Sequence, residues 1–517
     1  MGCPTTETYP LATLMSAVPE SSRFDRAIKL LWGLVLLTLP VTTFRYVPDF
    51  MGRTLVQPLA IYPLVILFVL LVIRFIREGR VALPSNTRLL IAFLLFAILV
   101  SIFGALYAPL PLRGSTYDER ILRGWVSLLI GLLFFFVAFW MNRTEADLRY
   151  SLKWIYAGLG LTIAWSLIQA IALNTSLIPR SLVNQIQTSF SARPLLPRRI
   201  SGFAYEPAWL ADQVVIFFMP WLFASILKRR PLFGYRWLEP LLFVLCFVVL
   251  VFTYSRGGLL SGILCTLLVF LIMGRDLLMR VWSWFNSPFS ALNQKFDAPA
   301  WTIRIAITVL LVIGVVSAVM FLSQYQYFAS IWDFVDDESP VDYLVDISAG
   351  PRLAYMMAGY QTFEDYPITG VGLGASGLFL FDRFPEWSYS IPEVARQLSP
   401  DSNQIPNIKS LYVRLLVETG LPGFWLFVVF LLSFLVLIRR MSTSNSSALR
   451  FIAAAGLFAW LGIVFRNLTQ DSFTIPITWV ILGILIGLSP YSPKEFRLRR
   501  VRHDQPQTRI RSLRSRS

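Results

Sequence analysis

Long, unbroken runs of apolar residues dominate the chain, and short polar segments separate them. A helix needs about 20 apolar residues to cross the roughly 30 Å hydrocarbon core of a membrane. Outer-membrane β-strands would instead alternate apolar and polar residues over about ten positions, which this chain does not do. The pattern predicts an all-α polytopic membrane protein with about 12 transmembrane helices, at approximately 28–44, 58–76, 88–107, 121–141, 154–173, 208–227, 237–255, 256–274, 303–322, 410–438, 451–467 and 474–490.

The predicted spans also divide the chain into parts. The seventh and eighth spans touch, which predicts a tight helical hairpin at Ser255-Arg256-Gly257-Gly258. Between spans nine and ten lies a segment of about 85 residues, far longer than an ordinary connection, in which we expect a helix over 352–364. The parts are an N-terminal segment (1–27), nine spans (28–322), the large loop (323–409), three spans (410–490) and a basic tail (491–517).

The composition excludes a soluble enzyme. Hydrophobic residues make up 56% of the chain and charged residues only 15%, whereas a soluble chain carries roughly 25% charged residues. The same numbers exclude a disordered scaffold and a secreted disulfide framework. The 46 Lys and Arg exceed the 30 Asp and Glu and give a net charge of +16, which in a membrane protein indicates basic loops that stay in the cytoplasm.

The charges also predict the orientation. With the N-terminus in the cytoplasm, the cytoplasmic side holds about 30 of the 46 basic residues and about a third of the acidic ones, as the positive-inside rule requires. Both termini are then cytoplasmic, and the loop 323–409 is periplasmic. We expect the tail to lie against anionic membrane lipids, and we expect no nucleic-acid partner.

Cysteine and histidine are too rare to build a metal site or a disulfide framework. The three cysteines have no metal-ligand or disulfide spacing, and the single histidine, His503, lies in the basic tail. We therefore expect no metal, no cofactor and no histidine base.

Ionisable residues at the outer edge of the membrane are costly and suggest function. Arg199 and Glu206-Pro207 lie where a loop enters span six, and Arg256 lies at the mouth of the hairpin. Glu206 could instead only complement the start of a helix, since proline and an acidic residue both suit its first turn. Arg256 could instead have no role in a site and only extend its side chain to the phosphate groups of membrane lipids.

Two further groups follow along the chain. Arg352 precedes a glycine-rich segment whose Gly372-x-Gly374-x-x-Gly377 has the spacing of a dinucleotide fingerprint but lacks the βαβ context that this fingerprint needs. Lys409, Arg414 and Glu418 then surround the start of span ten. Arg414 and Glu418 are four residues apart, so they could form only an ordinary ion pair on one helix face. Asp471, before the last span, is a further acidic candidate.

Together these groups predict a site for an anionic lipid. Arginine forks suit phosphate oxygens, because charge-assisted hydrogen bonds are roughly twice as strong as neutral ones. A polyprenyl diphosphate has an anionic head and a tail that belongs in lipid, and its departure drives glycosyl transfer without nucleotides. The residues are therefore consistent with a lipid-phosphosugar transferase.

The order and spacing of these groups resemble the bacterial O-antigen polymerase and O-antigen ligase superfamily. The similarity covers roughly residues 195–440 and rests on four pieces: Glu206-Pro207, Tyr254-Ser255-Arg256-Gly257-Gly258, Arg352 with Pro367-Ile-Thr-Gly370-Val-Gly372-Leu-Gly374, and Tyr412 through Glu418-Thr419-Gly420-Leu421-Pro422-Gly423.

The resemblance implies a GT-C-like fold in the bacterial inner membrane, an undecaprenyl-diphosphate-linked oligosaccharide as donor, and metal-independent glycosyl transfer on the periplasmic face. Arg256 and Arg352 match the diphosphate-binding arginines of the family. We expect Glu206 to be the general base, with Glu418 or Asp471 as alternatives, and Arg199, Lys409 and Arg414 to help bind substrate. A flippase and a chain-length regulator are the implied protein partners.

At one place this chain departs from the family pattern, and the difference helps to distinguish a polymerase from a ligase. Ligases carry a His-Asn pair where this chain has Lys409-Ser410. Lysine, with an ordinary pKa near 10.4, is a cation and not a base at neutral pH, and it suits a second phosphate-bearing substrate. The sequence therefore favours a polymerase that joins lipid-linked repeat units. A ligase that transfers glycan to lipid A core or protein is the alternative, and a flippase or transporter is a third reading.

Overall fold

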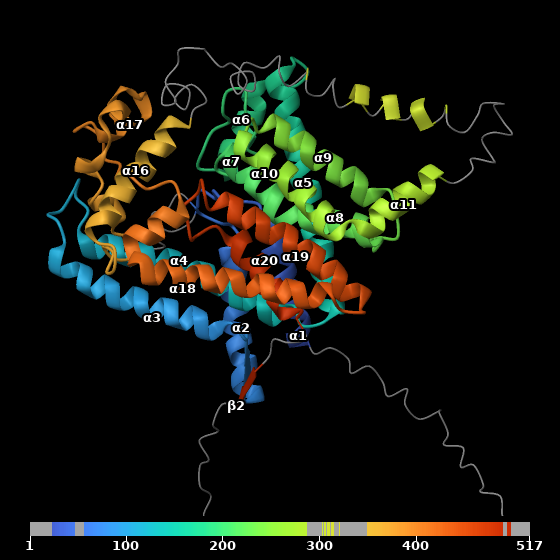
Figure 1. Ribbon diagram of the computed structural model, residues 1–517, viewed down its shortest axis with the longest axis horizontal. Coiled ribbons are helices and arrows are strands. Elements are labelled where there is room, and N and C mark those ends of the chain that lie inside the picture. The colour runs from blue at the N-terminus through green and yellow to red at the C-terminus, as the bar shows by residue number, and fades with distance from the viewer. Residues whose placement is uncertain are drawn as a thin grey trace, which may run out of the picture.

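A computed structural model describes residues 23–46, 56–286 and 349–489, with the strand 494–497 and parts of 302–320. Helices make up almost all of its regular structure (Figure 1). The apolar helices are α1 (Arg23–Thr38), α2 (Ile61–Glu78), α3 (Thr87–Gly104), α4 (Tyr117–Met141), α5 (Glu145–Asn174), α7 (Pro207–Gln213) continuing through a π-helical turn (Val214–Phe218) into α8 (Met219–Lys228), α9 (Leu238–Phe252), α10 (Arg256–Met273), α18 (Leu411–Ser442), α19 (Ser447–Arg466) and α20 (Pro476–Gly487).

The predicted all-α polytopic membrane fold is confirmed. Seven helices in the described residues are long and apolar enough to cross a membrane, and the α7–α8 unit is one of them. α9 and α20 are shorter apolar helices, while α1 and α2 cover the first two predicted spans. Half of the ninth predicted span, 303–322, falls outside the described residues.

Close helix approach holds the centre of the bundle together. α4 packs along α20, and α8 packs along α19. A Cβ added at Gly483 would lie 2.3 Å from the Phe135 carbonyl oxygen, and one at Gly131 would meet the Trp479 indole. Small residues let helix backbones approach closely where lipid provides no hydrophobic driving force, so these glycines allow α4 and α20 to pack.

The described segment 349–410, which precedes α18, forms a cap at one end of the bundle. It contains α16 (Gly350–Asp365), which extends the predicted helix 352–364, and α17 (Pro392–Leu398). Three 3₁₀ turns lie between them, at Ser376–Leu378, Phe381–Arg383 and Glu386–Ser390. Tyr355, Ala358 and Val394 belong to a second, smaller core, to which Tyr117 of α4 and Val417 of α18 also contribute. α16 and α17 lie at the left of Figure 1, and we call this end the α16 side.

The opposite end carries α11 (Arg275–Asn286) at the right of Figure 1, and we call it the α11 side. The C-terminal ends of α8 and α10 contact α11.

The C-terminal tail contains a short strand that is paired with another part of the chain. Strand β2 (Lys494–Arg497) pairs antiparallel with β1 (Arg80–Leu83) in the α2–α3 connection. The tail prediction did not include this strand, which lies beside a connection that the charge pattern assigns to the cytoplasm.

One predicted local feature is present, and one predicted span differs from the observed helix. The hairpin at 255–258 is present, with Ser255 capping α10 by accepting the Gly258 N–H. Span ten is broken at Gly420, whose φ of 61° departs from helical geometry. There the Leu421 N–H donates to the Pro367 carbonyl instead of continuing the helix. A break inside an apolar helix is tolerated where neighbouring segments satisfy its backbone groups.

Candidate active site

A polar cavity of about 260 Å³ opens on the α16 side, where α4, α7 and α18 begin and where α19 ends. A wider polar space of about 750 Å³ adjoins it, and both are lined by Glu206 and Lys409. We call the two together the polar cavity. Five residues that the sequence singled out line it, although they come from three distant segments: Glu206, Lys409, Arg414, Glu418 and Asp471.

Arg414 and Glu418 form the most enclosed part of the polar cavity. Their Nε–Oε1 distance is 2.9 Å, and only 15% and 1% of the two side chains are exposed. Arg414 also donates from Nη1 to the Asp471 carbonyl oxygen. The second carboxylate oxygen of Glu418 is buried without a hydrogen-bond partner. The pair is therefore a buried element of the cavity wall and not an exposed ion pair on a helix surface.

The glycine-rich segment brings a serine to this pair. Val371 and Gly372 donate their N–H groups to the Val417 and Glu418 carbonyls, at 2.8 and 3.0 Å. Gly374 has a φ of 97°, and a Cβ there would lie 2.5 Å from the Arg120 carbonyl oxygen. These glycines therefore serve close backbone packing, and not nucleotide binding. The turn delivers Ser376, whose hydroxyl donates to Glu418 Oε1 at 2.8 Å.

Arg120 is a cavity residue that the sequence analysis missed. It lies in the first turn of α4 and lines the polar cavity, with its Nε buried and without a hydrogen-bond partner. It interacts electrostatically with Arg414 and Glu418. The signal was present, because Arg120 directly precedes the span predicted at 121–141 and an ionisable residue at a membrane edge suggests function.

Glu206 lies where the two parts of the polar cavity meet. It is the residue before α7, but its side chain makes no capping hydrogen bond. Instead it pairs with Arg193 at 2.7 Å and remains 40% exposed. Arg193 in turn stacks over the Tyr205 ring. Glu206 is thus an accessible carboxylate held by one arginine.

Lys409 reaches the same junction from the end of the cap. Its backbone adopts a φ of 63°, and its Nζ lies 3.7 Å from Glu393. The ammonium also lies 5.3 Å from the centre of the Tyr355 ring. Burial raises the pKa of Tyr355 above its ordinary value, so this tyrosine stays neutral beneath the lysine.

Arg256 and Arg199 lie at the hairpin, outside the lining of the polar cavity. Arg256 is the first residue of α10 and is partly buried. Arg199 donates to the Thr253 and Tyr254 carbonyls at 3.1 and 3.4 Å. Arg199 therefore braces the turn that positions Arg256, a contact that the sequence did not predict.

Arg352 is exposed on the first turn of α16 and does not line the polar cavity. It interacts electrostatically with Asp212, six residues after Glu206 on α7. Asp212 pairs with Arg466 of α19 at 3.0 Å, and that arginine is only 4% exposed. Both members of this pair lie inside predicted spans, where charges suggest function, and the sequence analysis overlooked them.

The chemistry of the site is that of paired charges around water-accessible space. Arg120, Lys409 and Arg414 face the carboxylates of Glu206, Glu418 and Asp471 across the cavity lining. Within the described residues no group of three or more His, Cys, Asp and Glu is arranged to hold a metal ion. The arrangement can bind an anion through arginine and lysine, and it offers an accessible carboxylate to accept a proton.

Part of the chain matches a known protein family. Residues 241–428 match a family model described as O-Antigen ligase, which lies within the range 195–440 over which the resemblance was predicted. The match includes Arg256, Arg352, Lys409, Arg414 and Glu418. Glu206, Arg120 and Asp471 lie outside it. No curated protein matches the chain.

Proposed function

Because residues 241–428 form an O-antigen ligase family domain within the O-antigen polymerase and ligase superfamily, we propose that this membrane protein is a glycosyltransferase. Its donor is a glycan linked to undecaprenyl diphosphate, and its acceptor is a sugar hydroxyl presented at the periplasmic face of the bacterial inner membrane. The main support for this proposal is the polar cavity, which is lined by Glu206, Lys409, Arg414 and Glu418. The cavity lies at the end of the bundle that the charge pattern assigns to the periplasm.

In the proposed reaction, the acceptor hydroxyl oxygen attacks the anomeric carbon of the donor sugar. The bond from that carbon to the diphosphate oxygen breaks with inversion, and undecaprenyl diphosphate leaves with the bonding electrons. Arg256 and Arg352 hold the leaving diphosphate, since arginine forks match phosphate oxygens. The acceptor proton passes to a carboxylate of the site, as in general base catalysis.

Glu206 is the carboxylate that best fits the base. It is 40% exposed at the junction of the two cavity parts, and among the described residues it has a single ion-pair partner. Glu418 is instead held by Arg414 and Ser376 on one oxygen and is almost fully buried. A carboxylate that organises the wall is less suited to meet a sugar hydroxyl than one at the mouth.

The proposal favours a polymerase, and Lys409 is the reason. Lys409 lies where the two parts of the polar cavity meet, so it can contact a second substrate phosphate while the arginines hold the first. Both substrates of a polymerase carry lipid diphosphate. The description of the matching family model favours a ligase as the second candidate. A flippase and a chain-length regulator are proposed partners, and both chain termini are proposed to be cytoplasmic.

Activity on a defined substrate tests the proposal. Purified protein given only an undecaprenyl-diphosphate-linked repeat unit is expected to lengthen it, and Glu206→Gln is expected to lower turnover by about 10²–10⁴. Glu145→Gln is the matched control, because Glu145 also pairs with an arginine at 3.1 Å but lies on the α11 side. Single transfer only after core lipid or protein is added would establish the ligase. No transfer with any acceptor would refute the glycosyltransferase.

A further inference from the structure

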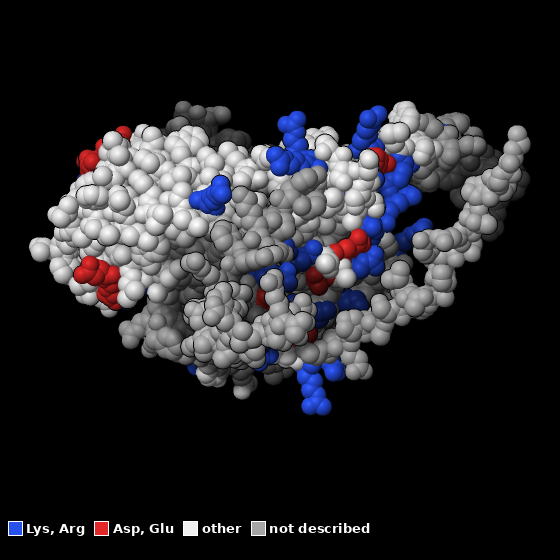
Figure 2. Space-filling view, turned by 90° about the horizontal axis from the view of Figure 1, so that it is seen from below, with Lys and Arg blue, Asp and Glu red and all other residues white. Residues whose placement is uncertain are grey.

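A second polar space lies at the α11 side, far along the helices from the polar cavity. It has a volume of about 500 Å³ and is formed by the end of α8, the start of α9 and α11. Three arginines line it, Arg229, Arg236 and Arg280, and one carboxylate, Glu239. We call it the basic pocket. On the face drawn in Figure 2, Lys and Arg gather toward the right-hand half, with some Asp and Glu among them.

Within the described residues, no arginine of the basic pocket forms an ion pair with a carboxylate. Arg229 and Arg236 are exposed and belong to none of the ion pairs there. Arg280 donates only to the Asp276 and Leu227 carbonyl oxygens, at 2.8 and 2.7 Å. Glu239 is 1% exposed and accepts the Leu232 N–H at 2.7 Å.

The positive charges of the basic pocket repel one another. Burial lowers the pKa of Arg280, the nearby charge of Arg229 lowers it further, and the Asp276 carboxylate acts in the opposite direction. The lining of the pocket therefore holds three arginines and one carboxylate, Glu239. The Asp276 carboxylate that also acts on Arg280 is already paired with Lys228. An anion placed among the three arginines would relieve this repulsion.

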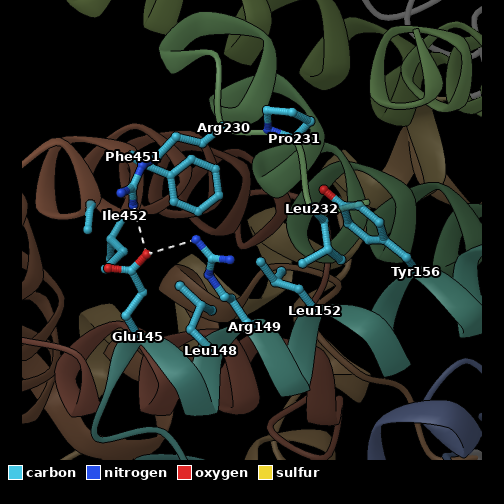
Figure 3. A pocket seen from close by; sticks show the side chains of 11 residues that line it. Glu145, Leu148, Arg149, Leu152, Tyr156, Arg230, Pro231, Leu232, Phe451 and Ile452 are labelled. Carbon is cyan, nitrogen blue, oxygen red and sulfur yellow. Dashed lines mark hydrogen bonds and ion pairs between the residues drawn. The ribbon is translucent and has the colours of Figure 1, made fainter. Parts of the chain in front are cut away.

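The adjacent pocket provides an internal comparison (Figure 3). It measures about 240 Å³ and lies between α5, α19 and the α8–α9 connection. There Arg230 and Arg149 both point to Glu145, at 3.1 and 3.4 Å. One carboxylate therefore already joins both arginines of that pocket, whereas no carboxylate of the described residues joins the arginines of the basic pocket in this way.

The surroundings of the basic pocket are those of a membrane interface. Tyr235 and Trp237 in the α8–α9 connection are each 62% exposed, and Trp282 of α11 is 66% exposed. Leu278 and Met279 of α11 are also exposed. Tyrosine and tryptophan gather where the membrane meets water, and a short helix with charged and apolar residues lies in the plane of that interface. An anion that enters here therefore lies beside surface suited to acyl chains.

We propose that the basic pocket binds the phosphate headgroup of an anionic phospholipid, whose acyl chains lie along α11. Arg229 and Arg236 supply guanidinium groups to the phosphate oxygens, and Arg280 lines the inner wall. Basic pockets between membrane helices suit such headgroups, and each nearby basic residue adds to the attraction. The proposal is independent of the glycosyl transfer, because no residue of the polar cavity takes part.

Lipid titration of the full-length protein tests this site. Protein in a neutral detergent would be titrated with cardiolipin, phosphatidylglycerol and phosphatidylcholine, and bound lipid would be measured by native mass spectrometry. Cardiolipin and phosphatidylglycerol are expected to bind, and phosphatidylcholine is not. Arg229→Asn with Arg236→Gln is expected to weaken anionic lipid binding about 30-fold. Asparagine is used because residue 229 has a φ of 51°, a conformation that asparagine tolerates.

The matched control removes the same charge elsewhere on the same side. Arg439 and Arg440 are exposed at the end of α18 and do not line the basic pocket, so Arg439→Gln with Arg440→Gln is expected to leave lipid binding unchanged. An equal loss in this control would show general surface attraction and overturn the proposal. Competition by glycerol phosphate at the same concentration as lipid would also overturn it, since the site would then take a free phosphate.

Discussion

The polar cavity and the basic pocket use the same residue types in opposite ways. In the polar cavity the cations face carboxylates, as in Arg414–Glu418, Lys409–Glu393 and Arg193–Glu206. In the basic pocket Arg229 and Arg236 have no such partner among the described residues. Paired charges hold one another in place and resist rearrangement, whereas unpaired charges need a counter-ion from outside. The first arrangement suits a reaction that requires fixed geometry, and the second suits a lipid that comes and goes.

The contrast between the polar cavity and the basic pocket requires that they lie on opposite sides of the membrane. Reporter fusions after residues 80, 148, 232, 290 and 445 are expected to report cytoplasm, and fusions near 115, 185 and 340 are expected to report periplasm, because basic loops stay inside. A cytoplasmic signal at 340 would contradict the assignment of the polar cavity to the periplasmic face.

Removing one partner of the buried pair is expected to give the largest loss of stability. Arg414→Leu leaves Glu418 as a buried, uncompensated charge, and breaking such a pair costs about 3–5 kcal/mol. The control is Arg74→Leu, since Arg74 and Glu78 are also four residues apart but 43% and 49% exposed, and exposed pairs contribute at most about 1 kcal/mol. Thermal unfolding in detergent measures both.

A second variant separates charge burial from lost packing. Arg414→Leu combined with Glu418→Met removes both charges, and replacing a buried pair with apolar residues is often neutral. The double variant is therefore expected to regain most of the stability that Arg414→Leu loses. If it stays as unstable as the single variant, the pair matters by its shape and not by its charge.

Arg256 and Arg352, which do not line the polar cavity, are expected to affect turnover more than stability. Arg256→Ala or Arg352→Ala should lower turnover by about 10²–10³, the scale for removing one donor to a developing charge. Lysine at either position should restore only part of the lost turnover, because it lacks the bidentate fork of arginine. The protein level in the membrane is the control. Unchanged glycan synthesis by both alanine variants would contradict their role on the diphosphate.

Lys409 is expected to give the smallest effect. Lys409→Ala should weaken lengthening of the repeat unit by about tenfold, on the scale of one charge-assisted contact. Lys409→Arg should weaken it less, because the positive charge stays. Equal activity of wild type and both variants would remove the argument for a second phosphate and would favour the ligase.

The sequence by itself determined the architecture. Unbroken apolar runs require helices in a membrane, because every backbone polar group there must be bonded within its own segment. The hairpin before Arg256 and the helix near 352–364 follow from local rules of glycine, proline and periodicity. The membrane-edge rule also found Glu206, Lys409, Arg414, Glu418 and Asp471, which the fold gathers around one cavity.

Only the tertiary structure decided which of these charges are neighbours and how each is used. Arg414 and Glu418 have the spacing of an ordinary surface ion pair. They are instead buried in the wall of the polar cavity, because the glycine-rich turn that carries Ser376 packs against them. Arg199 became a brace for the hairpin, and Arg120 entered the cavity from a helix almost 300 residues away. Burial and partners depend on contacts between distant segments, and these contacts arise only when the helices pack.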